Sequence, residues 1–114
     1  MPSKIERCAI YIRVSTAEQM MHGKSLEAQK QYLTNYAKEH NMTVAGVYAD
    51  EGKTARKELK KRKAIHALLE DVKAGKIDVI IFWRIDRWFR NLSDFYKVQE
   101  VLDNNNVRWI STSE

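Results

Sequence analysis

The chain has 114 residues, of which 44% are hydrophobic and 31% charged, and it carries a formal net charge of +5. A domain of this size buries about two thirds of the surface that its unfolded chain exposes, which is enough for a core without disulfide or metal staples. No apolar run approaches the roughly 20 residues of a membrane-spanning helix, and the single cysteine, Cys8, excludes an internal disulfide. Because residues 1–7 are short and polar before the first apolar run, we expect no signal peptide. The composition predicts one soluble globular domain.

Two strands and a helix are predicted in the first half of the chain. Residues 8–14 (CAIYIRV) and 43–49 (TVAGVYA) are short runs of β-branched and aromatic residues, which are typical of strands. Between these runs, Ser25 is a candidate N-cap for a helix. One face of this helix repeats at helical spacing and includes a single polar residue; its members are Leu26, Gln29, Leu33, Tyr36 and Ala37.

The second half of the chain repeats the alternation. Apolar residues within 65–72 recur at i, i+3, i+4 and i+7, which predicts a helix, and Gly75 is its expected C-cap. Residues 77–83 (IDVIIFW) contain a continuous apolar run, as in a strand covered on both faces. Residues 92–105 return to helical spacing, and residues 107–111 supply a fourth strand. This order predicts a three-layer α/β fold, with a mainly parallel sheet of four or five strands flanked by helices.

The positive charge is concentrated in one segment. Residues 53–63 carry six more basic than acidic side chains, so all other residues together carry −1. Two interpretations stay open. Such a run is either a solvated loop or a loop that contacts a polyanion, because clustered lysine and arginine are the electrostatic footprint of nucleic-acid binding. The candidate contact residues are Lys53, Arg56, Lys57, Lys60, Lys61 and Lys63.

The charged residues that follow the predicted strands are candidates for a functional site, since ligands of open α/β sheets bind beyond the carboxyl ends of the strands. Arg13 and Ser15 follow the first strand and share one of its faces, because they are two residues apart. Several guanidinium groups around one hydroxyl suit phosphate chemistry, since they bind phosphate oxygens in pairs and stabilise a negative transition state. The other candidates are Asp50 after the second strand and Arg84, Asp86, Arg87 and Arg90 after the third.

Other interpretations of these residues compete with that of a serine nucleophile. Asp86 and Arg90 are spaced to form an ion pair at the start of a helix, which needs no catalytic role. None of the histidines, at positions 22, 40 and 66, follows a strand, which argues against a Ser-His-Asp triad. No cluster has metal-ligand spacing, and the glycines form neither a dinucleotide-binding turn nor a P-loop.

Three segments of the chain carry recognisable motifs. Residues 11–16 (YIRVST) contain Ser15 and are followed by Gln19, residues 23–29 read GKSLEAQ, and residues 85–91 read IDRWFRN. In this order they resemble the N-terminal signature, the first-helix segment and the second motif of the serine site-specific recombinases, which comprise resolvases, invertases and large serine integrases. The likeness covers nearly the whole chain and is greatest to the large subfamily.

The resemblance implies that the Ser15 hydroxyl attacks a DNA phosphodiester, giving a 5′-phosphoseryl link and a free 3′-OH without metal, nucleotide or cofactor. Asp86 is our choice of general acid to the leaving 3′ oxygen. For Gln29, a structural role in tying the helix to backbone groups stays open beside the functional one. The implied catalytic residues are Ser15, Arg13, Arg87, Arg90, Asp86 and Arg62, with Arg56 as the alternative to Arg62, and the supporting residues are Gln19, Gln29 and Asp50.

The chain departs from the family pattern chiefly in the basic segment. Lys61 stands where an acidic residue usually precedes the arginine, and residues 52–55 (GKTA) lack the usual Ser-Gly turn. Arg84 stands where lysine is common, and residues 88–89 (WF) are bulkier than usual. These departures leave a second hypothesis open, a non-catalytic nucleic-acid-binding or regulatory module that kept the fold. A small-molecule phosphatase is a third.

The resemblance also implies partners and domain organisation. Family members continue past the fourth strand into a dimerising helix and DNA-binding modules, so we expect residues 1–114 to be a single catalytic domain truncated at its C-terminal end. The expected substrate is the double-stranded DNA of a mobile element or phage, and the expected location is the bacterial cytoplasm. The full-length protein would be a dimer on DNA and a tetramer in synapsis. The fragment would be a monomer or weak dimer with little or no activity.

Overall fold

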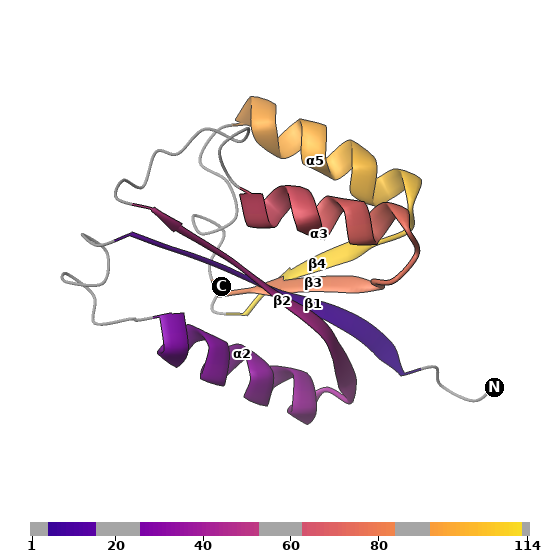
Figure 1. The fold of residues 1–114 in the computed structure, drawn as a ribbon. Coiled ribbons are helices and arrows are strands. Elements are labelled where there is room, and N and C mark those ends of the chain that lie inside the picture. The colour runs from indigo at the N-terminus through magenta and orange to yellow at the C-terminus, as the bar shows by residue number, and fades with distance from the viewer. Residues whose placement is uncertain (1–4, 16–25, 53–62, 84–91, 113–114) are drawn as a thin grey trace.

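A computed structural model describes residues 5–15, 26–52, 63–83 and 92–112 of the chain. The described strands form a parallel sheet in the order β2-β1-β3-β4. Helix α2 covers one face of this sheet, and α3 and α5 cover the other (Figure 1). The predicted three-layer α/β fold is therefore confirmed, with four strands. The elements are β1 (Glu6–Ser15), α2 (Leu26–Glu39), β2 (Met42–Gly52), α3 (Lys63–Lys73), β3 (Val79–Phe82), α5 (Leu92–Asn104) and β4 (Arg108–Ser111).

The core is divided into two parts by the alternation of side chains along the central strand β1. Ile10 and Ile12 pack with Leu33 of α2 on one face, whereas Tyr11 packs with residues of α3 and α5 on the other. All four residues of β3 are buried, as expected of a strand covered on both sides. Each fully buried leucine or isoleucine contributes about 1.5–3 kcal/mol to folding. No helix in the described ranges is long and apolar enough to cross a membrane.

Helices α3 and α5 end in the same way, with a residue in the left-handed region. At the end of α3, Gly75 has φ +76°, its N–H donates to the carbonyl of Val72 at 3.0 Å, and the N–H of Lys76 donates to the carbonyl of Asp71 at 3.1 Å. At the end of α5, Asn106 has φ 58°. These bonds satisfy helix carbonyls that lack partners within the helix. The predicted C-cap at Gly75 is confirmed.

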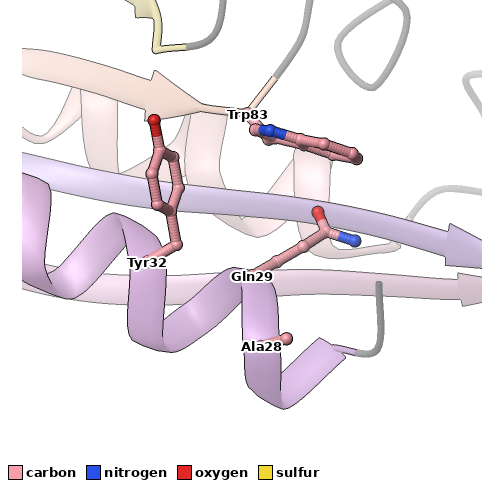
Figure 2. A pocket seen from close by; sticks show the side chains of 4 residues that line it. All are labelled: Ala28, Gln29, Tyr32 and Trp83. Atoms are coloured by element: carbon pink, nitrogen blue, oxygen red, sulfur yellow. The ribbon is translucent and has the colours of Figure 1, made fainter. Parts of the chain in front are cut away.

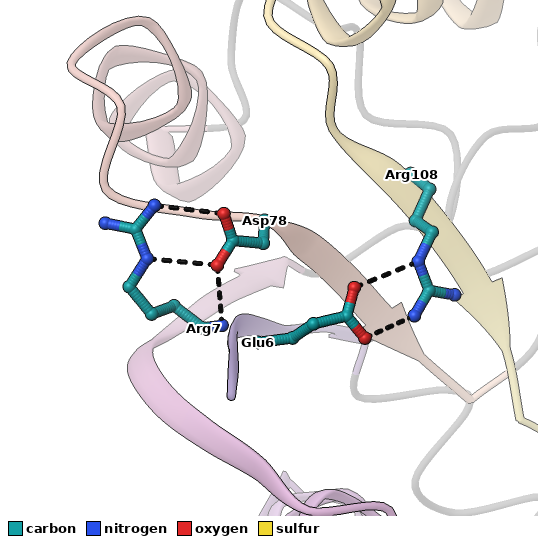
Figure 3. Close-up of polar contacts among 4 residues, drawn as sticks. All are labelled: Glu6, Arg7, Asp78 and Arg108. Atoms are coloured by element: carbon teal, nitrogen blue, oxygen red, sulfur yellow. Dashed lines mark hydrogen bonds and ion pairs between the residues drawn. The ribbon is translucent and has the colours of Figure 1, made fainter. Parts of the chain in front are cut away.

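Two arginine–carboxylate pairs join the strands at their amino ends (Figure 3). The Nε and Nη2 atoms of Arg7 each donate to a different oxygen of Asp78 at 3.0 Å, and the Arg7 backbone N–H donates to Oδ2 at 2.8 Å. The hydrogen bonds from Arg7 to Asp78 raise the pKa of the guanidinium, against the effect of burial. Arg108 Nε donates to Glu6 Oε2 at 3.2 Å. These pairs bring opposite charges together at the amino edge of the sheet.

Strand β2 contains one extra residue opposite β1. Cys8 pairs with Val44 and Ala9 pairs with Gly46, which leaves Ala45 as the residue of a bulge. Because side chains alternate with a period of two, this insertion exchanges the faces of all later residues of β2. The bulge directs Tyr48 and Asp50 toward α3. The sequence pattern of residues 43–49 did not predict it.

Gly46 is required by the aromatic ring that follows it. A Cβ atom at this position would lie 2.9 Å from the hydroxyl oxygen of Tyr48 and 3.0 Å from two of its ring carbons. With no side chain at Gly46, the Tyr48 ring lies against the strand and its hydroxyl donates to Asp71 Oδ2 in α3. This bond joins the edge strand to the helix that covers it.

A substitution at Gly75 tests the helix end. We expect Gly75→Ala to lower the free energy of unfolding by about 1 kcal/mol, because a Cβ atom strains the left-handed conformation. Gly75→Asn should cost less, since asparagine tolerates that region and occupies it at Asn106. Urea unfolding measures both values. Equal losses for the two variants would contradict this account.

The pKa of Tyr48 predicts a loss of stability at alkaline pH. Burial, and then the hydrogen bond to the Asp71 carboxylate and its negative charge, raise the pKa of Tyr48 to about 12 from 10.0. The folded state therefore binds the proton of the Tyr48 hydroxyl more tightly than the unfolded state does. The contribution of this hydroxyl to the free energy of unfolding is complete below pH 10 and is lost as the pH rises toward 12. We expect Tyr48→Phe to reduce the alkaline fall in the free energy of unfolding, measured by urea titration at several pH values. A variant with the same alkaline fall as the wild type would refute the assignment.

Candidate active site at the carboxyl ends of the strands

The carboxyl ends of β1 and β2 bring three of the predicted site residues together. In the sheet register, Arg13 is the partner of Asp50, and Ser15 is the partner of Gly52. All of these residues lie within the two strands, which extend further than the sequence pattern indicated. For Ser15 the structure describes the backbone at the end of β1. The predicted roles of these residues stay predictions.

The carboxylate of Asp50 is buried and accepts hydrogen bonds from two other elements. Its Oδ2 atom accepts from the Tyr11 hydroxyl at 2.7 Å and from the Ile65 N–H at 3.2 Å. Its Oδ1 atom accepts from the Ala64 N–H at 2.9 Å. The N–H groups at the start of a helix lack partners within it, and the helix dipole favours a negative charge there. Asp50 therefore caps α3 from a neighbouring strand.

Arg13 is a buried cation beside this carboxylate. Its side chain is only 6% exposed, and it shares the face of Tyr11, two residues earlier in β1. The register places it next to Asp50, on the same side of the sheet. A buried charge is costly unless opposite charges and hydrogen-bonding groups surround it. The neighbouring Asp50 is an opposite charge of this kind.

Gln29 lies on the other face of the sheet. It is buried in α2 and lines an open cavity of about 110 Å³ together with Ala28, Tyr32 and Trp83 (Figure 2). Tyr32 stands at this cavity and donates from its hydroxyl to the backbone carbonyl of Thr112 at 3.4 Å. The sheet separates Gln29 from the face that carries Tyr11. Both the functional role and the structural role predicted for this glutamine stay open.

Among the remaining predicted residues, the structure describes Lys63. Lys63 is the first residue of α3 and is exposed, directly before the two residues whose N–H groups bind Asp50. The other predicted residues, and the candidate N-cap Ser25, lie outside the described ranges. Among them, the predicted site residues are Gln19, Arg62, Arg84, Asp86, Arg87 and Arg90, and the predicted contact residues are Lys53, Arg56, Lys57, Lys60 and Lys61.

Sequence reasoning missed the part that Tyr11 plays at this site. The signal was present, because Tyr11, Arg13 and Ser15 alternate along one face of β1. The bulge at Ala45, which places Asp50 within reach of Tyr11, has no comparable signal.

Within the described ranges, no group of three or more His, Cys, Asp or Glu side chains is placed to hold a metal ion. Burial raises the pKa of the Cys8 thiol, which keeps it protonated.

Comparison with known proteins identifies the family. Residues 8–114 match the model of the resolvase N-terminal domain. The chain belongs to this family, and the resemblance noted in its motifs is confirmed. Among curated proteins, a putative DNA recombinase of Bacillus subtilis (strain 168) is 34% identical over 99 residues, which are 87% of this chain. The chain spans 19% of the length of that relative.

Solved structures of an integrase and of two recombinases share the fold. The N-terminal catalytic domain of TP901-1 integrase has a TM-score of 0.80 and 33% identity, over 93% of this chain and 77% of that one. The C-terminal catalytic domain of ISC1926 TnpA, an IS607-like serine recombinase, has a TM-score of 0.77 and 30% identity, over 92% and 66%. A resolvase family site-specific recombinase from Streptococcus pneumoniae has a TM-score of 0.75 and 31% identity, over 95% and 72%.

Substitution of Asp50 tests its structural role. We expect Asp50→Ala to lower the free energy of unfolding by about 3–5 kcal/mol, because it leaves buried donors on Tyr11 and α3 without their acceptor. Asp50→Asn should cost less, since one oxygen remains as an acceptor. Asp103→Asn is the matched control at an exposed position and should change the value by less than about 0.5 kcal/mol. Urea unfolding gives all three values, and an Asp50→Ala loss as small as the control would contradict the capping role.

Proposed function

We propose that this chain is the catalytic domain of a serine recombinase that cuts and rejoins DNA through Ser15. The observation that carries the proposal is the buried Arg13 at the end of β1, two residues before Ser15 and in register with the buried Asp50. Membership of the resolvase family supports it. So does the likeness to the catalytic domains of TP901-1 integrase and of an IS607-like serine recombinase.

The proposed reaction is a transesterification at phosphorus. The Ser15 hydroxyl loses its proton to a general base, and its Oγ atom forms a bond to the phosphorus while the bond from phosphorus to the 3′ oxygen breaks. The products are a 5′-phosphoseryl link and a 3′-OH, whose proton comes from Asp86 in our assignment. Attack of a 3′-OH on the phosphoseryl link reverses these steps and rejoins the strand. Because one phosphate ester replaces another, the reaction needs no external energy source and no cofactor.

The arginines are proposed to hold the phosphate. Arg13, Arg87 and Arg90 would bind its non-bridging oxygens and stabilise the negative charge of the pentacovalent transition state. A neighbouring guanidinium also favours the ionised form of the serine hydroxyl. Arg62, or Arg56 in its place, would complete the set, with Gln19, Gln29 and Asp50 in support.

The basic segment is proposed to contact the DNA backbone next to the site. Its last lysine, Lys63, is exposed, and the following residues Ala64 and Ile65 are held by Asp50. The residues that follow the basic segment are therefore held at the carboxyl edge of the sheet, where Arg13 also lies. Lysine and arginine contacts to phosphates release counterions, so we expect the affinity to fall with increasing salt concentration.

We also propose that residues 1–114 are one catalytic domain of a longer protein. The chain spans 19% of the B. subtilis relative that it matches. Recognition of the target site would then reside elsewhere in that protein, which would act in the cytoplasm as a dimer on DNA and a tetramer in synapsis. A mobile element or phage is the proposed source.

Substitution of Ser15 tests the proposed function. In the protein that carries this chain, we expect Ser15→Ala to abolish the covalent protein–DNA adduct, detected as a species that survives denaturation. Arg13→Lys should reduce adduct formation by a hundredfold or more, of the order expected when a pre-organised charged donor is lost, because an ammonium does not reproduce a guanidinium fork. Thr43→Ala, at an exposed position of β2, is the control and should leave the adduct unchanged.

The outcome separates the proposed function from its alternative. An adduct that persists in Ser15→Ala would refute the assignment of the nucleophile. A wild-type protein that binds DNA with a steep salt dependence and never forms an adduct would instead support a non-catalytic DNA-binding module.

A further inference from the structure

We propose that Thr112 is a positioning residue of this site, which acts by fixing Trp83, the residue that follows β3. The inference rests on the proposed function, because Trp83 directly precedes the segment with the proposed phosphate-binding residues Arg87 and Arg90. Thr112 belongs to none of the three motifs named above. In this role it acts through the backbone at the end of β3 and touches neither DNA nor the reacting atoms.

Thr112 forms two hydrogen bonds to the last residue of β3. Its backbone N–H donates to the Phe82 carbonyl at 3.0 Å, which continues the pairing of β4 with β3 beyond Ser111. Its hydroxyl donates to the same carbonyl at 3.2 Å, and the Trp83 carbonyl oxygen lies 3.5 Å from the hydroxyl oxygen. The hydroxyl is therefore placed between the last carbonyl of the strand and the first carbonyl after it.

The pairing of β3 with its neighbours ends before Trp83. The register of β3 with β1 runs to Ile81, and the register with β4 runs to Phe82. Phe82 is fully buried, and the centroid of its ring lies 5.6 Å from that of Trp109, so the core holds this residue. Trp83 is only half-buried. The Thr112 hydroxyl thus reaches one carbonyl beyond the part of β3 that the sheet and the core hold.

Thr112 is itself held by the helix on one face of the sheet. Its carbonyl oxygen accepts a hydrogen bond from the Tyr32 hydroxyl of α2 at 3.4 Å. Tyr32 and Trp83 line the same cavity as Gln29, which is one of the proposed supporting residues (Figure 2). Thr112 therefore contacts both aromatic residues of this cavity, and a displacement of the end of β4 would move two of its walls.

The Trp83 carbonyl belongs to the peptide group that leads into residues 84–91. Rotation of this peptide group changes the direction in which the chain leaves β3, and with it the placement of the arginines that follow. A misplacement of about 1 Å in a catalytic constellation can cost about a hundredfold in rate. A hydroxyl that fixes this peptide group therefore affects the cleavage step more than the binding of DNA.

Three variants test the role of the hydroxyl in the protein that carries this chain. Thr112→Val removes the hydroxyl and keeps the branched shape and the backbone bond, Thr112→Ser keeps the hydroxyl, and Thr43→Val makes the same change at an exposed position of β2. We expect Thr112→Val to slow cleavage at saturating DNA by about five- to tenfold, the ratio that one hydrogen bond supports. Its Kd for DNA should stay unchanged. Thr112→Ser and Thr43→Val should cleave at the wild-type rate.

NMR of the 114-residue chain supplies a readout that does not depend on activity. We expect Thr112→Val to shift the carbonyl and indole Nε1–H signals of Trp83 together with the Nε–H signal of Arg87, and Thr43→Val to leave them in place. All rates are compared under conditions in which urea unfolding shows each variant to be folded.

Cleavage at the wild-type rate by Thr112→Val, equal slowing by Thr112→Ser or Thr43→Val, or unshifted Trp83 signals would overturn the proposal. If the wild-type protein forms no Ser15-dependent adduct, the proposed function fails, and the NMR comparison still decides whether Thr112 fixes Trp83.

Discussion

The candidate site depends on the hydrogen bonds that the buried carboxylate of Asp50 accepts. It lies in β2, caps α3 through Ala64 and Ile65, and accepts the hydroxyl of Tyr11 in β1. Three elements that are distant in sequence meet at one pair of oxygen atoms. A negative charge in this position is stabilised by the α3 dipole and by its donors, so the energy of burying it is offset by the contacts that define the site.

Charged side chains lie at both edges of the sheet, in different surroundings. At the amino edge, Arg7 pairs with Asp78, and Arg108 pairs with Glu6, so each arginine there already has a carboxylate partner. At the carboxyl edge, Arg13 is buried next to Asp50, whose oxygens are also occupied by Tyr11 and α3. The first edge stabilises the sheet, whereas the second carries the residues to which we assign the proposed chemistry of a protein of the resolvase family.

Much of the fold was predictable because its signals are local. The apolar spacing within residues 65–72 predicted α3, and Gly75 ended it as expected, since only a residue tolerant of positive φ suits that position. The uninterrupted apolar run before Trp83 predicted a strand covered on both faces. The bulge at Ala45 was not predictable, because it depends on how β2 aligns with β1 and on the space that the Tyr48 ring needs over Gly46.

By itself, the sequence determined the order of strands and helices and the motif residues Arg13 and Ser15, because helical and strand periods and strand alternation are properties of neighbouring residues. Only the tertiary structure decided that Tyr11 and the first turn of α3 converge on Asp50, and that Gln29 lies on the opposite face. The physical reason is that the side chain that accepts from Ala64 and Ile65 lies in β2, 14 and 15 residues earlier in the chain, so no local sequence pattern shows it. This acceptor is defined by the packing of α3 on the sheet.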